Sequence, residues 1–115
     1  MKILIVSPFF PPMATVAIVR ISSLARQLLK EGHELTVIRN EFNCEVDTLS
    51  ESYSDLLTLK TYKVKLDQNT RYFEAARSYK KIFRKVLNKQ KFDVVFITAG
   101  PYYTIPLCKI AKKEY

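Results

Sequence analysis

Apolar and polar positions along the chain fall into two kinds of pattern, short apolar runs and longer amphipathic stretches. The short runs are typical of strands, and the longer stretches repeat apolar residues at helical spacing. The predicted strands are 1–7, 34–39, 57–66 and 93–98, and the predicted long helices are 16–30 and 70–90. Their order predicts an α/β, Rossmann-like three-layer fold with a mostly parallel sheet of about four strands.

The four predicted strands differ in how apolar they are. Residues 93–98 are almost continuously apolar, which predicts a strand buried on both faces, whereas residues 57–66 alternate with lysines, which predicts a strand near the sheet edge. Thr15 is suited to cap the first helix, and Gly32 supplies its left-handed stop. Residues 40–56 are polar and acidic and predict a loop with one short helix.

The end of the chain predicts one more helix, with Thr104 as its N-cap and Pro106 in its first turn. The 115 residues allow one domain, 1–115, and four strands are fewer than a doubly wound domain usually has. We therefore expect the front part of a longer protein. No apolar run approaches the roughly 18–20 residues of a membrane span, and the start lacks a signal-peptide pattern, which together predict a cytoplasmic location.

Charge is concentrated in one segment of the chain. The net charge is +8, but residues 1–70 carry eight basic and eight acidic residues that cancel. Residues 71–91 carry eight basic residues against Glu74 alone. This basic helix face has three interpretations: a solvated surface, a contact with anionic lipids, or a nucleic-acid contact. Nucleic acid is disfavoured because Tyr72, Phe73 and Tyr79 are expected mostly to face the core. The membrane-surface candidates are Lys80, Lys81, Arg84 and Lys85.

Several chemistries are excluded or disfavoured by composition. With only two glycines, the chain holds neither a Gly-x-Gly-x-x-Gly fingerprint nor a Walker A loop. The single histidine, His33, falls in the turn entering the second strand, away from the ligand crevice of a parallel sheet. Cys44 and Cys108 lack metal-ligand spacing. We expect no catalytic residue, no metal and no bound cofactor.

The residues around the first two strands resemble a known family. The chain begins Met-Lys-Ile-Leu-Ile-Val-Ser, continues with Phe9-Phe10-Pro11-Pro12, and then carries Arg20-Ile21-Ser22-Ser23-Leu24-Ala25 and Gly32-His33-Glu34-Leu35-Thr36-Val37. Later it carries Asp93-Val94-Val95-Phe96-Ile97-Thr98 and Gly100-Pro101-Tyr102-Tyr103. This set is similar to the amino-terminal part of family-4 glycosyltransferases, in particular sugar transferases of bacterial surface-polysaccharide assembly.

The resemblance implies a GT-B fold, in which two Rossmann-like domains face each other across a cleft. The amino-terminal domain receives a lipid-linked or saccharide acceptor, and the carboxyl-terminal domain holds most nucleotide-sugar contacts. This chain would be a partial acceptor-side domain, inactive alone, in an enzyme working at the inner membrane face. The implied cleft residues are Pro12, Met13, Ala14, Thr15, Gly100, Tyr102 and Tyr103.

One position departs from the family pattern, and two other interpretations remain. The family usually has glycines after Pro12, where this chain has Met13-Ala14-Thr15, and Met13 adopts positive φ only at a cost. Direct phosphate contact by this loop is therefore doubtful. The chain could also be a stand-alone binding or assembly module, or a small basic nucleic-acid binder. An unpaired sheet edge would favour a homodimer.

Overall fold

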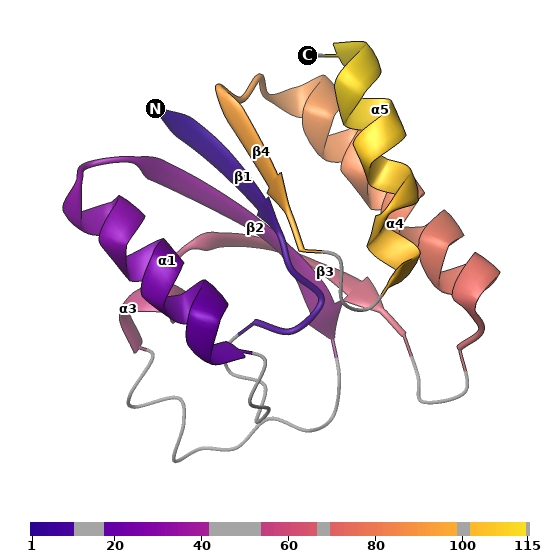
Figure 1. The fold of residues 1–115 in the computed structure, drawn as a ribbon, viewed down its shortest axis with the longest axis horizontal. Coiled ribbons are helices and arrows are strands. Elements are labelled where there is room, and N and C mark those ends of the chain that lie inside the picture. The colour runs from indigo at the N-terminus through magenta and orange to yellow at the C-terminus, as the bar shows by residue number, and fades with distance from the viewer. Residues whose placement is uncertain (11–17, 42–53, 67–69, 99–101, 115) are drawn as a thin grey trace.

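Four parallel strands form one sheet in the order β3-β2-β1-β4 (Figure 1). The computed structural model describes residues 1–10, 18–41, 54–66, 70–98 and 102–114. The elements are β1 (Lys2–Val6), α1 (Ile18–Lys30), β2 (Glu34–Glu41), α3 (Ser54–Leu57), β3 (Lys60–Lys65), α4 (Tyr72–Lys89), β4 (Val94–Ile97), η1 (Tyr102–Thr104) and α5 (Pro106–Glu114). The predicted α/β, Rossmann-like class is confirmed.

Helices cover both faces of this sheet and make it the middle of three layers. Figure 1 shows α1 and α3 on one side of the strands and α4 and α5 on the other. The central strands β1 and β2 are buried on both faces, β1 with apolar residues and β2 with both apolar and polar residues. Each parallel pair of strands needs a crossover, and α1 provides the one between β1 and β2.

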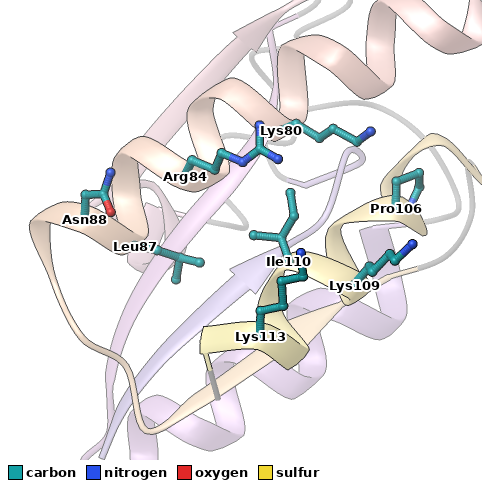
Figure 2. Close-up of a pocket in the computed structure, with 8 residues that line it drawn as sticks. All are labelled: Lys80, Arg84, Leu87, Asn88, Pro106, Lys109, Ile110 and Lys113. Atoms are coloured by element: carbon teal, nitrogen blue, oxygen red, sulfur yellow. The ribbon is translucent and has the colours of Figure 1, made fainter.

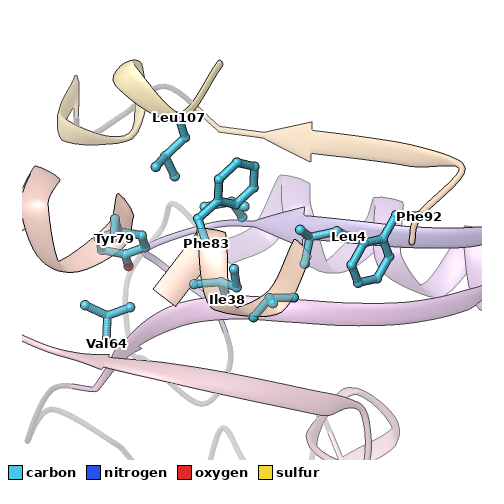
Figure 3. Packing of buried hydrophobic residues seen from close by; sticks show 9 residues of the cluster. Leu4, Ile38, Val64, Tyr79, Phe83, Phe92 and Leu107 are labelled. Atoms are coloured by element: carbon cyan, nitrogen blue, oxygen red, sulfur yellow. The ribbon is translucent and has the colours of Figure 1, made fainter. Parts of the chain in front are cut away.

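The larger core lies between the sheet and the helices α4 and α5. Figure 3 shows Tyr79 and Phe83 of α4 packed with Leu107 of α5 against Leu4 and Ile38 of the sheet. All five side chains are fully buried. In α4, the residues Ala75, Ala76, Tyr79, Phe83 and Val86 recur at helical spacing and form the buried stripe that the sequence predicts.

The second core lies between the sheet and α1. Ile3 and Ile5 of β1 point to this side, whereas their neighbours Leu4 and Val6 belong to the larger core, because side chains alternate across a strand. Ile21 and Ala25 of α1 complete it. The predicted stop of α1 is confirmed: Gly32 has a φ of 87°, and its N–H donates to the Leu29 carbonyl.

Three expectations from the sequence are wrong. Leu57 belongs to α3, so the third strand begins at Lys60. The apolar segment β4 is an edge strand, because no strand is paired on its outer side in the described residues. Its side chains Val94 and Phe96 are each 41% exposed. Tyr72 and Phe73 of α4, which were expected mostly to face the core, are 45% and 78% exposed, whereas Tyr79 is buried as expected. The expected edge position of the third strand is confirmed.

Within the described ranges, no helix is long and apolar enough to cross a membrane.

Two phenylalanines of α4 test which side of this helix supports the fold. Replacing buried Phe83 by Ala leaves a cavity in the larger core and should lower the free energy of unfolding by about 3–5 kcal/mol. The same change at exposed Phe73 should alter it by no more than about 0.5 kcal/mol. Urea unfolding followed by circular dichroism measures both. Similar losses in the two variants would contradict the assigned core.

Candidate functional site

The sheet topology marks one edge as the place for a ligand. From β1 the chain passes through α1 to β2 and then β3, but β4 returns to the other side of β1. The helices that follow β1 and β4 therefore lie on opposite faces of the sheet. In open α/β sheets the ligand crevice lies outside the carboxyl ends of strands at such a switch point. In this sheet the switch-point position is beyond Val6 and Ile97.

The backbone at this edge is held by hydrogen bonds between strand ends. The Ser7 N–H donates to the Ile38 carbonyl at 2.9 Å, and the Thr98 N–H donates to the Val6 carbonyl at 2.9 Å. The Thr104 hydroxyl of η1 donates to the Thr98 carbonyl at 2.5 Å. Thr98, directly after β4, is thereby hydrogen-bonded both to the end of β1 and to η1, which precedes α5.

A buried polar cluster stands beside the switch point. Asn40, at the end of β2, is fully buried. Its side-chain oxygen accepts a hydrogen bond from the Tyr79 hydroxyl of α4, and its amide nitrogen donates to the Tyr103 hydroxyl of η1 at 2.8 Å. The two tyrosine rings lie 5.3 Å apart between centroids. We call Asn40, Tyr79 and Tyr103 the amide–tyrosine cluster; it joins β2, α4 and η1 at the carboxyl edge.

Electrostatics keep both phenols of this cluster protonated. Burial raises the pKa of Tyr79 far above its usual value, although the positive charge of Arg39 acts in the opposite direction. Burial also raises the pKa of Tyr103, while its hydrogen bond with Asn40 opposes the shift. Arg39 is itself 5% exposed, and its guanidinium donates to the Asn40 carbonyl at 2.9 Å. Both phenols are therefore neutral near neutral pH, and of the two only Tyr103 is partly exposed.

The structure describes few of the residues expected to line the cleft. Pro12, Met13, Ala14, Thr15 and Gly100 lie outside the described residues. Tyr102 begins η1 next to Tyr103. Tyr103 lies at the carboxyl edge, is half-buried and belongs to the amide–tyrosine cluster.

The cluster also contains residues that the sequence analysis did not assign to a site. Asn40 follows the apolar residues Val37 and Ile38, and a polar amide at the end of a buried strand was the available signal. Tyr79 was identified only as part of the apolar stripe of its helix. The hydrogen bonds of its hydroxyl depend on β2, which lies 39 residues earlier in the chain.

Other candidate groups lie elsewhere or have no metal-binding geometry. The His33 ring is 3.1 Å from the amino-terminal nitrogen of Met1, so it lies at the amino edge of the sheet, as expected. Cys108 is an exposed free thiol. The described part of the chain contains no group of three or more metal-ligating side chains.

The four membrane-surface candidates separate into two pairs on α4. Lys80 and Arg84 line a groove between α4 and α5, whose other wall carries Lys109 and Lys113 (Figure 2). Lys81 and Lys85 are exposed and do not line that groove. The sequence therefore identified two of the cations that meet there, whereas the two from α5 required the packing of the helices.

The Tyr79 hydroxyl generates a pH-dependent prediction. A Tyr79→Phe change leaves the buried Asn40 oxygen without its donor, so the free energy of unfolding should fall by about 1–3 kcal/mol at neutral pH. The folded-state pKa of Tyr79 is raised above its unfolded value of 10.0, so its contribution is complete below pH 10 and is lost as the pH rises further.

The difference between the wild type and Tyr79→Phe should accordingly narrow above pH 10, by up to about 1.4 kcal/mol per pH unit. Urea unfolding across that range measures it, and subtraction cancels the titration of the lysines common to both proteins. A difference that stays constant with pH would contradict the assigned burial of this phenol.

Comparison with known proteins adds no identification. No protein-family model, no curated protein and no solved structure matches this chain. Its function is inferred from the carboxyl edge, the charged helices and the sequence resemblance.

Proposed function

We propose that this chain forms the acceptor-side domain of a glycosyltransferase that moves a sugar from a nucleotide-sugar donor to a lipid-linked or saccharide acceptor. The main support is the amide–tyrosine cluster beside the switch point. Asn40 and Tyr79 are fully buried and hold the half-buried Tyr103 in place, so Tyr103 is the member of the cluster that can exchange hydrogen bonds with a sugar hydroxyl. A phenol already held in place loses little freedom on binding. The resemblance to family-4 glycosyltransferases points the same way.

The proposed role is to hold the acceptor, with the reaction requiring a second domain. His33, the only histidine, lies at the opposite edge of the sheet from the amide–tyrosine cluster. By the resemblance, the nucleotide-sugar is bound by the carboxyl-terminal domain. A lipid-linked acceptor would bring the domain to the cytoplasmic face of the membrane, and exposed Lys81 and Lys85 could then face anionic lipids.

The alternative is a stand-alone binding module that recognises its ligand elsewhere. The observation that favours it is the groove between α4 and α5, where cations gather away from the amide–tyrosine cluster. The two functions differ in which part of the protein responds to a saccharide.

The proposal predicts binding of the acceptor without turnover. The purified chain should hydrolyse or transfer no sugar from any nucleotide-sugar. An acceptor saccharide should shift the NMR signals of the Asn40 side-chain amide, because this amide donates to the hydroxyl of Tyr103, the half-buried residue proposed to contact the acceptor. The side-chain amide of Asn88, which lines the α4–α5 groove, is the control and should not move.

Turnover above a blank would refute the inactive-alone proposal. If acceptor saccharides shift neither amide, or only that of Asn88, the carboxyl edge is not an acceptor site.

We further propose that β4 pairs with a second copy of the chain. This strand lies at an edge of the sheet, and its apolar residues Val94 and Phe96 are 41% exposed. Sedimentation at high micromolar concentration should show a dimer or larger species. Phe96→Glu should shift it to monomer, whereas Val19→Glu, at an exposed apolar position of α1, should not. A wild-type monomer under these conditions would contradict the pairing.

A further inference from the structure

The groove between α4 and α5 has the size and the charge of a ligand site. Its volume is about 440 Å³, within the range of about 300–1,000 Å³ usual for small-molecule sites. Figure 2 shows Ile110 directed from α5 into the space between the helices. Leu87 of α4 and Ile110 are partly buried against the larger core, so the floor is apolar while the walls are charged.

The cations of this groove come as two pairs at helical spacing. Lys80 and Arg84 are four residues apart on α4, and Lys109 and Lys113 are four residues apart on α5. Like charges at this spacing repel one another, and packing the two helices together brings the pairs to one groove. Lys80 is half-buried, which weakens its contact with water. All four cations therefore line the same groove.

The part of the groove lining that the structure describes contains no carboxylate. The ion pairs found there join Arg26 to Asp55 and His33 to Glu31, and neither pair involves the groove. The neighbouring hollow between β4 and α5 differs, because it is lined by both Asp93 and Lys112. The excess positive charge thus belongs to the α4–α5 groove rather than to every hollow of this surface.

We propose that this groove binds a ligand carrying two phosphate groups. A phosphate monoester carries about −1.5 to −2 charge near neutral pH, so two such groups balance the four cations. The Arg84 guanidinium can donate two parallel hydrogen bonds to phosphate oxygens, and the Asn88 amide can add a further donor at the same wall. The apolar floor suits the organic part of the ligand. This site is independent of the proposed acceptor site.

Inorganic pyrophosphate tests the proposal directly. It should shift the Asn88 side-chain amide in the NMR spectrum of the whole chain and leave the Asn40 amide unchanged. Titration calorimetry should give a dissociation constant about tenfold larger for Lys80→Gln/Arg84→Gln than for the wild type. Orthophosphate, with one phosphate group, should bind more weakly than pyrophosphate in the same groove.

The other lysine pair of α4 provides the matched control. Lys81→Gln/Lys85→Gln removes the same number of charges from the same helix but leaves the groove intact, so it should change the dissociation constant by less than about twofold. If Lys80→Gln/Arg84→Gln does not fold, Lys109→Gln/Lys113→Gln removes the opposite wall and should also weaken binding about tenfold. An unmoved Asn88 amide, or equal weakening by groove and control pairs, would overturn the proposal.

Vesicles distinguish a membrane-bound source of phosphate from a soluble one. Vesicles of a phosphatidic acid and phosphatidylcholine mixture, added to the pyrophosphate complex, should displace pyrophosphate if lipid headgroups occupy the groove. Retention of pyrophosphate in their presence assigns the groove to a soluble diphosphate. A third outcome is that pyrophosphate does not bind and that the groove and control substitutions weaken vesicle binding equally. The cations would then act only as surface charge.

Discussion

Burial of β1 and β2 on both faces is the constraint from which the rest of the arrangement follows. Their side chains alternate between the two cores, so helices must cover both sides of the sheet. β2 and β3 lie on one side of β1, and β4 lies on the other side. The helix that follows β1 and the helix that follows β4 therefore cover opposite faces of the sheet. The switch point at the carboxyl edge is a consequence of filling the sheet. The location of the candidate site is thus set by the same burial that stabilises the fold.

Asn40 connects that edge to the larger core. A buried amide without hydrogen-bond partners would lower the stability of the fold. The side-chain oxygen and nitrogen of Asn40 are instead hydrogen-bonded to tyrosines from two different elements. Tyr79 of α4 therefore both packs in the core and donates a hydrogen bond to Asn40 at the carboxyl edge. A movement of α4 would break this hydrogen bond and disturb the edge. Such a satisfied polar group favours one relative placement of β2, α4 and η1. A rigid edge is what a saccharide site formed by neutral groups would need.

The sequence predicted those parts of the fold that depend on residues close together in the chain. The apolar run of β1, the strand expected at 34–39, the buried stripe of α4 and the stop at Gly32 are local signals, and they are confirmed. The sequence of β4 resembles a central strand, but its edge position depends on which strands pair beside it. Tyr103 could be predicted from the resemblance, whereas Asn40 and Tyr79 meet across 39 residues of chain. Likewise, the sequence did not predict that Lys109 and Lys113 line the same groove as Lys80 and Arg84, because only the packing of α5 on α4 brings the two pairs together.

The two helical layers of the molecule differ in how their charged side chains are paired. On the α1 and α3 side, Arg26 lies 3.1 Å from Asp55, and its hydrogen bond lowers the pKa of that carboxyl group. On the α4 and α5 side, cations gather at one groove while, among the described residues, the ion pairs are found elsewhere. Exposed ion pairs contribute little to stability, so the fold does not depend on a carboxylate in the described lining of the groove. The cations of the groove leave a positive field to attract an anion. The carboxyl edge and the cationic helix layer therefore differ in chemistry, which is why a saccharide is proposed at one and phosphate groups are proposed at the other.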